Sequence, residues 1–379
     1  MWRTYRYRLY PSAAQAKSLA EILHLSCQVY NLALAHRRKR WNESRESVSY
    51  NQQAALWRDW RNEDPDANPL RLINMSAGQQ VLRRLDSAYR MFLKGERGRP
   101  RFQKSSDFNS VNYKPGDGAQ VKQNRLYVQS VGLVRVRWHR ERPDGSLKNI
   151  VIVRQPSGWY ARLQYALPES GAAPSANPPV GVDVGLTHAL ALSDGTMVDS
   201  PRFLGKSLKR LRVLQRSVAR KNKGSANRRK AIARLARQHE RIDNQRRDFW
   251  HKTTRKLVDT YGAIALENLS LGFMLRNHNL ARAAHDVGLG MFRELLNYKA
   301  IKAGVELTEV NHANTSQACS GCGCIVQKEL RVRVHDCPNC GLVIDRDTNG
   351  ARNILRLGHS RWALTWPTTA SVAQEAPPL

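Results

Sequence analysis

The first ten residues alternate between apolar and basic side chains. Tyr5, Tyr7 and Leu9 fall on one side of an extended segment, and Arg6 and Arg8 fall on the other. This period of two is typical of a β-strand with one buried face. We therefore expect the chain to begin with a strand whose second face is basic.

Between residues 11 and 95 the apolar residues recur at spacings of three and four, which predicts α-helices. We expect a first helix after Pro11-Ser12 that ends in the basic run 37–40, a second over about 51–61, and a third from near Ser76. The apolar stripes comprise Leu19, Ile22, Leu23, Tyr30 and Leu34 in the first helix and Val81, Leu85, Ala88, Tyr89 and Phe92 in the third. Together the three predict a small helical bundle.

The period returns to two between residues 108 and 167. Short alternating runs, separated by turns at 144–145 and 157–158, predict the strands of a small barrel or sandwich, and the N-terminal strand is a candidate member of it. Arg135 and Arg137 alternate with apolar residues here, so one face is basic. The loop 95–104 is an exposed connection or a phosphate-binding segment, and its candidate nucleic-acid contacts are Arg99, Arg101 and Lys104.

Residues 168–179, rich in Pro, Ala and Ser, predict a linker. Two apolar strands are expected after it, at 180–186 and 189–192. Residues 202–256 then hold twenty Lys or Arg against three acidic residues around a helical apolar seam, which predicts a helical hairpin with basic outer faces. Such a hairpin would repel itself without an anionic partner, and its candidate nucleic-acid contacts are Lys206, Lys209 and Arg210.

The last third of the chain mixes strands and helices. We expect, in order, an apolar strand at 262–269, a glycine-punctuated loop from Gly272 to Gly290, a helix over 292–300, a strand at 305–310, a final helix through 353–355, and a disordered tail over 359–379.

Two Cys-x-x-Cys pairs, Cys319 with Cys322 and Cys337 with Cys340, lie fourteen residues apart. This spacing is typical of a zinc ribbon, in which four thiolates hold a structural Zn²⁺. Four unrelated cysteines or two disulfides are the alternatives, and six cysteines in 379 residues without a secretory signal favour zinc. Cys27 and Cys324 are left over; we expect Cys324 to be a surface thiol rather than a spare ligand.

The charge of the chain is strongly unbalanced, with 62 Lys and Arg against 31 Asp and Glu and a formal net charge of +31. This excess indicates a polyanionic partner. Nucleic acid is favoured over a membrane surface, because no apolar run approaches the roughly 18 residues of a bilayer span and no lipidation motif is present. We expect a cytoplasmic protein that is nucleoid-associated when bound to DNA.

Three acidic residues occupy comparable places in the predicted elements. Asp183 lies in an apolar strand, Glu267 ends another, and Asp347 precedes the last helix. Buried carboxylates are costly unless a cation neutralises them, so three that converge indicate Mg²⁺ or Mn²⁺. Two such ions about 4 Å apart can hydrolyse a phosphodiester. Each acid alone also has a structural explanation: a turn cap before Gly185, the start of a loop, or a helix N-cap.

The order of these acids, with the zinc ribbon directly before the third, resembles the TnpB (OrfB) family of transposon-encoded RNA-guided DNA nucleases, which is related to the compact type V CRISPR effectors. The resemblance covers nearly the whole chain, and the segments that carry it are 5–11, 181–185, 265–269, 315–323, 337–341 and 345–351.

This resemblance implies an α+β multidomain fold. Its expected parts are a wedge β-barrel (1–10 and 96–167) with an inserted helical recognition bundle (11–95), the linker (168–179), an RNase H-like RuvC nuclease domain (180–318 and 341–358), its inserted zinc ribbon (319–340) and the tail (359–379). It also implies that Asp183, Glu267 and Asp347 are the catalytic Mg²⁺ ligands, that Asp345 has a lesser or structural role, and that the loop 272–290 is a lid.

The implied activity is RNA-guided DNA cleavage. A guide RNA from the transposon end would pair with double-stranded target DNA beside a short motif read by the protein, with one protein per guide RNA. Two alternatives stay open: a nuclease-inactive RNA-guided repressor, against which the intact acids speak, and an accessory protein of a strand-transfer transposase.

Overall fold

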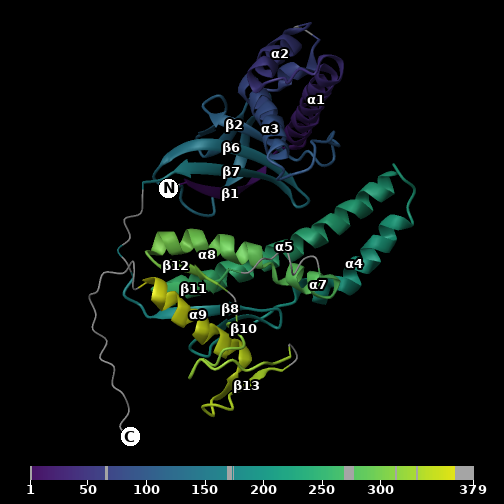
Figure 1. The fold of residues 1–379 in the computed structure, drawn as a ribbon. Coiled ribbons are helices and arrows are strands. Elements are labelled where there is room, and N and C mark those ends of the chain that lie inside the picture. The colour runs from purple at the N-terminus through teal and green to yellow at the C-terminus, as the bar shows by residue number, and fades with distance from the viewer. Residues whose placement is uncertain are drawn as a thin grey trace. The chain divides into compact units, whose positions relative to one another are not determined.

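The computed structural model describes residues 2–64, 67–168, 173, 175–268, 277–311, 314–329 and 332–362 (Figure 1). Two compact units divide the chain, Met1–Glu169 and Ser170–Leu379. The division falls inside the stretch 168–179, whose composition predicts a linker. Among the described residues, no helix is both long enough and apolar enough to cross a bilayer.

The first unit contains a closed barrel with the strand order β1-β5-β4-β3-β2-β6-β7. β1 pairs antiparallel with both β5 and β7, so the first strand of the chain closes the barrel as expected. Its alternation follows from this position, because Tyr7 and Leu9 lie in the core while Arg6 and Arg8 lie on the outer face. The strands are β1 Trp2–Tyr10, β2 Ser110–Pro115, β3 Gly118–Lys122, β4 Arg125–Val128, β5 Gly132–Arg137, β6 Ser146–Gln155 and β7 Gly158–Ala166.

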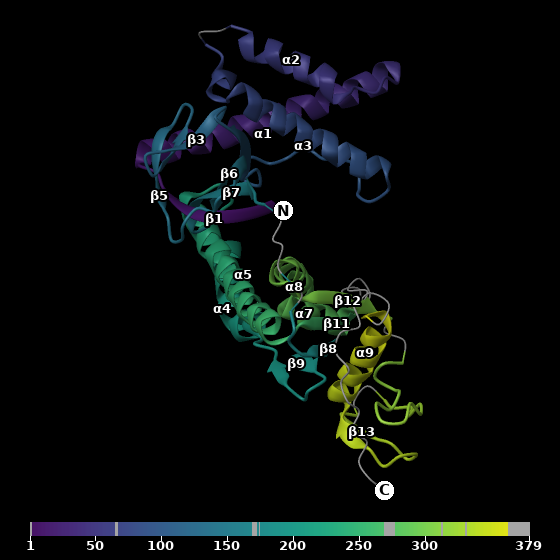
Figure 2. The same ribbon diagram turned by 90° about the vertical axis from the view of Figure 1, so that its left-hand side faces the viewer.

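Helices are inserted between β1 and β2 and lie together beside the barrel (Figure 2). They are α1 Ala13–Ser44, α2 Tyr50–Asn62, the short 3-10 helix η1 Pro69–Leu72 and α3 Met75–Leu93. Ser12 and Ser49 start α1 and α2 with capping boxes. One apolar core runs from these helices into the barrel and includes Leu23, Leu82 and Phe108.

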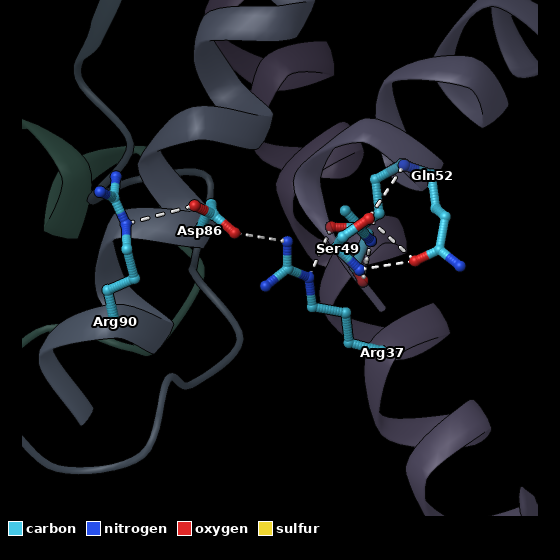
Figure 3. A network of polar contacts seen from close by, with 7 residues as sticks. Arg37, Ser49, Gln52, Asp86 and Arg90 are labelled. Atoms are coloured by element: carbon cyan, nitrogen blue, oxygen red, sulfur yellow. Dashed lines mark hydrogen bonds and ion pairs between the residues drawn. The ribbon is translucent and has the colours of Figure 1, made fainter. Parts of the chain in front are cut away.

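A buried arginine joins the three α-helices of this unit (Figure 3). Arg37 of α1 is 8% exposed, and its Nε donates to Gln53 Oε1 of α2 at 2.6 Å. Its Nη2 donates to Asp86 Oδ1 of α3 at 3.1 Å, and Asp86 also pairs with Arg90. Since an unpaired buried charge is costly, these contacts restrict how the helices pack against one another.

The second unit is built on a five-stranded sheet in the order β10-β9-β8-β11-β12. β11 pairs in parallel with both β8 and β12, whereas β9 pairs antiparallel with both β8 and β10. The strands are β8 Pro179–Val184, β9 His188–Leu192, β10 Met197–Asp199, β11 Ala263–Glu267 and β12 Glu306–Val310. A separate two-stranded ribbon consists of β13 Val334–Asp336 and β14 Val343–Asp345.

Helices cover both faces of this sheet, and Figure 1 shows α8 and α9 on opposite sides of it. Val180, Val182, Ile264 and Leu266 pack in a core with α5 and α8. On the other face Ala263 and Ala265 pack with α9, so successive residues of one strand alternate between the two layers. The helices are α4 Phe203–Ala219, α5 Ala226–Thr260, α7 His278–Val287, α8 Leu289–Ala303 and α9 Arg346–Trp362; α4 and α5 form the expected basic hairpin.

Two expectations for this unit are wrong in part. The loop expected from Gly272 to Gly290 is largely helical, because His278–Val287 forms α7 and Leu289 already begins α8; residues 269–276 lie outside the described part. Residues 359–362, which were expected to belong to a disordered tail, are helical. α9 continues to Trp362, whose buried indole donates from Nε1 to Thr308 Oγ1 at 2.9 Å, and residues 363–379 lie outside the described part.

Candidate metal centres and nucleic-acid surfaces

Asp183 and Glu267 end neighbouring parallel strands on one face of the sheet. The register of β8 and β11 sets Val182 opposite Leu266, so the residues that follow them lie side by side. Glu267 shares its face with Ala263 and Ala265, which pack on α9. The two acids that the sequence places 84 residues apart are therefore neighbours under one helix.

Asp347 of α9 lies near Asp183 because this helix packs closely on the sheet. A Cβ on Gly350 would lie 3.0 Å from Asp183 Oδ2, so this turn of α9 rests on the Asp183 carboxylate. Asp347 stands three residues earlier in the same helix, about one turn from Gly350. The structure thus brings both Glu267 and Asp347 close to Asp183, and we call these three residues the acid cluster.

The helix N-cap is supplied by Asp345 and not by Asp347. Asp345 Oδ1 accepts hydrogen bonds from the backbone N–H groups of Asp347 at 2.9 Å and Thr348 at 3.0 Å. The Asp347 carboxylate is left for other contacts, and its Oδ2 lies 3.7 Å from Nη1 of the exposed Arg333. The capping explanation considered for Asp347 is therefore wrong, and the structural role expected for Asp345 has a geometric basis.

The electrostatics of this cluster favour a bound cation. Burial, and next the nearby carboxylates of Glu267 and Asp347, raise the pKa of Asp183 to about 8, although Arg346 acts in the opposite direction. Glu267 is 6% exposed and accepts a hydrogen bond from the Thr315 hydroxyl at Oε1. Oxygen ligands that repel one another in this way fit a hard divalent ion such as Mg²⁺ or Mn²⁺.

The four ribbon cysteines meet in a second centre. The Sγ atoms of Cys319, Cys322, Cys337 and Cys340 all lie within 4.8 Å of one another. Two of the separations, Cys319 to Cys340 and Cys322 to Cys337, are 3.6 Å. Four sulfurs about 2.3 Å from a tetrahedral Zn²⁺ would be about 3.8 Å apart, so the cluster fits a structural zinc site.

Backbone turns hold these thiols in place. Gly323 N–H donates to Cys319 O and Gly341 N–H to Cys337 O, both at 2.9 Å, and both glycines have positive φ. Of the two remaining cysteines, Cys324 is exposed and outside the cluster, whereas Cys27 is buried in α1. The set of four predicted from the spacing is thus the set that the fold assembles.

The predicted nucleic-acid contacts are exposed on two separate elements. Lys206, Lys209 and Arg210 occupy one face of α4, because they are spaced by three and four residues. The loop before β2 carries the others, Arg99, Arg101 and Lys104. No contact in the structure tests their role.

A further basic surface lies on the outer faces of β5, β1 and β7, and we call it the barrel wall. Arg8 lies directly opposite Arg137 across β1 and β5, and Arg6 lies opposite Arg162 across β1 and β7. Like charges in cross-strand pairs destabilise a sheet. The guanidinium of Arg8 also lies over the Tyr160 ring, 4.8 Å from its centroid. The alternation in the sequence predicted Arg6, Arg8 and Arg137 on a basic face, but not Arg162. The pairing of these arginines across strands depends on a register that the sequence pattern does not encode.

Three family models match parts of this chain. Residues 162–278 match the family described as "Probable transposase" (OrfB_IS605), residues 290–354 match "Cas12f1-like, TNB domain", and residues 1–46 match a "Helix-turn-helix domain" family. In the structure the last of these regions consists of β1 and the single long helix α1.

The relatives span almost the full chain. A Streptomyces pristinaespiralis protein named "Putative RNA-guided DNA endonuclease" is 34% identical over 361 residues, covering 94% of this chain and 89% of its own. The Escherichia coli protein of the same name, with the suffix InsQ, is 28% identical over 381 residues, with 94% and 92% covered.

The fold is also found among solved structures. The cryo-EM structure of a Cas12f1–sgRNA–target DNA complex matches 89% of this chain with a TM-score of 0.58 and 14% identity, and 82% of its own chain is covered. This likeness shows the fold, and the sequence relatives show that the chain belongs to the TnpB (OrfB) family, which is related to the type V CRISPR effectors.

Proposed function

We propose that the protein is a transposon-encoded, RNA-guided DNA endonuclease. The observation that carries the proposal is the cluster of Asp183, Glu267 and Asp347 on one face of the sheet, in a chain of net charge +31 that belongs to the TnpB family. In this assignment the second unit is an RNase H-like RuvC nuclease domain with its zinc ribbon. The first unit is the wedge barrel with its helical recognition bundle.

The three carboxylates are proposed to hold Mg²⁺ or Mn²⁺ at the scissile phosphate. Two such ions, when bound, supply an activated water and stabilise the leaving oxygen of a phosphodiester. Asp183 is proposed as the ligand shared with both other acids, because Glu267 and Asp347 each lie close enough to raise its pKa. Asp345 stays outside this set, since its Oδ1 is engaged by the first turn of α9.

Each remaining part has a role that follows from its chemistry. The guide RNA reads the target by base pairing, so the protein needs contacts to phosphates and to the shape of the duplex rather than to bases. The barrel wall and the α4 and α5 hairpin offer such contacts at exposed arginines and lysines. Zinc at the four cysteines is structural, because all four positions of the tetrahedron are occupied by thiolates.

The experiment is cleavage of guide-matched DNA by the protein purified with its guide RNA. The wild type should linearise a plasmid in Mg²⁺ and should not do so in EDTA. Asp183→Ala should bind the plasmid but leave it intact. Asp199→Asn is the matched control, since this acid of the same unit is 85% exposed in its side chain and lies on β10.

The outcomes separate the possible functions. Cutting that survives Asp183→Ala or EDTA would disprove the proposed chemistry. Guide-dependent binding without cutting by the wild type would indicate a repressor, and joining of transposon ends without RNA would indicate a strand-transfer protein.

A further inference from the structure

Asn349 of α9 hydrogen-bonds the backbone on both sides of Cys319, in the turn from Cys319 to Cys322 that we call the zinc knuckle. Asn349 Nδ2 donates to Ala318 O at 2.8 Å, and Asn349 Oδ1 accepts from Ser320 N–H at 2.8 Å. These two backbone groups stand immediately before and after Cys319. Asn349 is 0% exposed, as is Cys319, so both bonds are made away from water. A shift of Cys319 would therefore be transmitted to α9.

A second asparagine on the same face of α9 extends this contact toward the sheet. Asn353 follows Asn349 by four residues, one helical turn on, and is 2% exposed. Its Nδ2 donates to Ala318 O at 2.7 Å and to Thr315 O at 2.9 Å. Its Oδ1 is buried and has no hydrogen-bond partner among the described residues. Burying an unpaired carbonyl is unfavourable. The two hydrogen bonds that Asn353 donates from its NH₂ group therefore have to offset this cost.

Thr315 completes the connection to the acid cluster. Its backbone carbonyl accepts from Asn353, and its hydroxyl donates to Oε1 of Glu267. Thr315 is 5% exposed and Glu267 is 6% exposed. Because this bond engages Oε1, it restricts the rotation of the Glu267 carboxylate. We call Thr315, Asn349 and Asn353 the zinc–acid bridge.

We infer that the zinc–acid bridge positions Glu267 and Asp347, so that the zinc site sets the affinity of the acid cluster for its divalent ion. Asp347 lies two residues before Asn349 in α9, and Glu267 is held by Thr315, so both acids are attached to the knuckle at Cys319. The inference rests on the proposed function. The alternative is that zinc stabilises only the ribbon loop itself. In that case the ribbon would have no effect on the position of Glu267.

The direct test measures Mn²⁺ binding to the full-length zinc-loaded protein by electron paramagnetic resonance, in the absence of RNA and DNA. Thr315→Val keeps the shape of the side chain and removes the donor, so it should weaken Mn²⁺ binding by about 10–100-fold, the usual cost of losing a partner of a metal ligand. Thr315→Ser, which retains the hydroxyl, should restore most of the affinity. Asn349→Ala should weaken binding as well, while atomic emission still finds the same zinc content as in the wild type.

A matched control separates positioning from general stability. Thr254→Val also removes a buried threonine hydroxyl, which donates to Trp250 O on α5, on the opposite face of the sheet. It should lower the melting temperature without changing the Mn²⁺ affinity. The Mg²⁺ concentration at half-maximal DNA cleavage is the second readout, and it should rise for Thr315→Val and not for Thr254→Val.

The outcomes distinguish this inference from the proposed function. If Asp183→Ala abolishes Mn²⁺ binding while Thr315→Val and Asn349→Ala bind like the wild type, the bridge is disproved and the acid centre stands. If Asp183→Ala binds Mn²⁺ as the wild type does, or the wild type binds none at millimolar concentration, both proposals fail. Loss of zinc from Thr315→Val would also contradict the inference, because it would show that the threonine maintains the ribbon itself.

Discussion

Gly181 of β8 and Ala351 of α9 meet where the helix crosses the sheet: a Cβ on residue 181 would lie 2.1 Å from the Ala351 carbonyl oxygen and 2.6 Å from the Leu355 nitrogen. Both obstacles are backbone atoms, which cannot rotate away. The crossing therefore requires glycine, and it is this close approach that brings α9 down to Asp183.

Gly181→Ala should force α9 away from β8 and separate Asp347 from Asp183. We expect a loss of about 1–3 kcal/mol in stability from overpacking, together with a loss of DNA cleavage. Thermal unfolding and plasmid cleavage measure the two effects. Gly205→Ala in α4 is the control: its Cβ would meet nothing closer than 3.7 Å, so it should be neutral or stabilising. Wild-type cleavage by Gly181→Ala would contradict the account of the crossing.

Arg137→Gln should affect folding and RNA binding in opposite directions. It removes one of two like charges paired across β1 and β5, so the stability of the barrel should rise or stay unchanged. If the barrel wall contacts phosphates, RNA affinity should fall, and the slope of log affinity against log salt should decrease by about 1.

Filter binding at several salt concentrations, with a melting curve of the same sample, checks both parts of this prediction. Glu141→Gln is the control. It removes a negative charge from an exposed residue shortly after β5, so it should not weaken RNA binding. An Arg137→Gln protein with an unchanged salt slope would remove the barrel wall from the nucleic-acid surface.

Lys299 should make the stability of the second unit depend on pH. Burial, and next the charge of Arg255, lower the pKa of Lys299 to about 8, whereas a lysine in the unfolded chain titrates near 10.4. Below pH 8 the folded protein carries this unfavourable charge, and the penalty is lifted as the pH rises from about 8 toward 10.

Lys299→Met loses the hydrogen bonds that Lys299 Nζ donates to His251 O and Thr254 Oγ1 at any pH. Its stability relative to the wild type should therefore be highest near pH 7 and should fall by pH 9.5, where the wild-type lysine is no longer charged. Melting temperatures of both proteins across this range provide the measurement. Lys302→Met on the same helix α8 is the control, since this lysine is exposed. A constant difference between Lys299→Met and the wild type at all pH values would argue against the lowered pKa.

The zinc ligand set predicts unequal effects of two cysteine substitutions. Cys337→Ser removes one of four clustered thiols and should greatly reduce zinc content, because the closed tetrahedral site loses a ligand. Cys324→Ser lies outside the cluster and should keep one zinc per chain. Atomic emission on the purified proteins decides between them. Zinc loss from Cys324→Ser would show that the set of four is incomplete.

Local patterns in the sequence predicted much of this molecule. The alternation of Tyr7 and Leu9 with arginines predicted β1, and the helical periods predicted α1, α3 and the α4 and α5 hairpin, because burial of one face leaves a period in the chain itself. The cysteine spacing predicted the four-thiol cluster, because a tight turn brings the two cysteines of each pair together. The placement of Asp183 and Glu267 in apolar strands and of Asp347 near the start of the last helix agrees with the closeness of the other two acids to Asp183.

Other features have no local signal and were decided by the tertiary structure. Whether Asp345 or Asp347 caps α9 depends on where that helix begins, and Trp362 prolongs it because β12 offers Thr308 as a partner. Thr315 gives no pattern before folding places it against Glu267. The sequence by itself determined which elements form and which residues can bind ions. The fold alone determined which of those residues touch, because strand register and helix crossings are set by contacts between segments far apart in the chain.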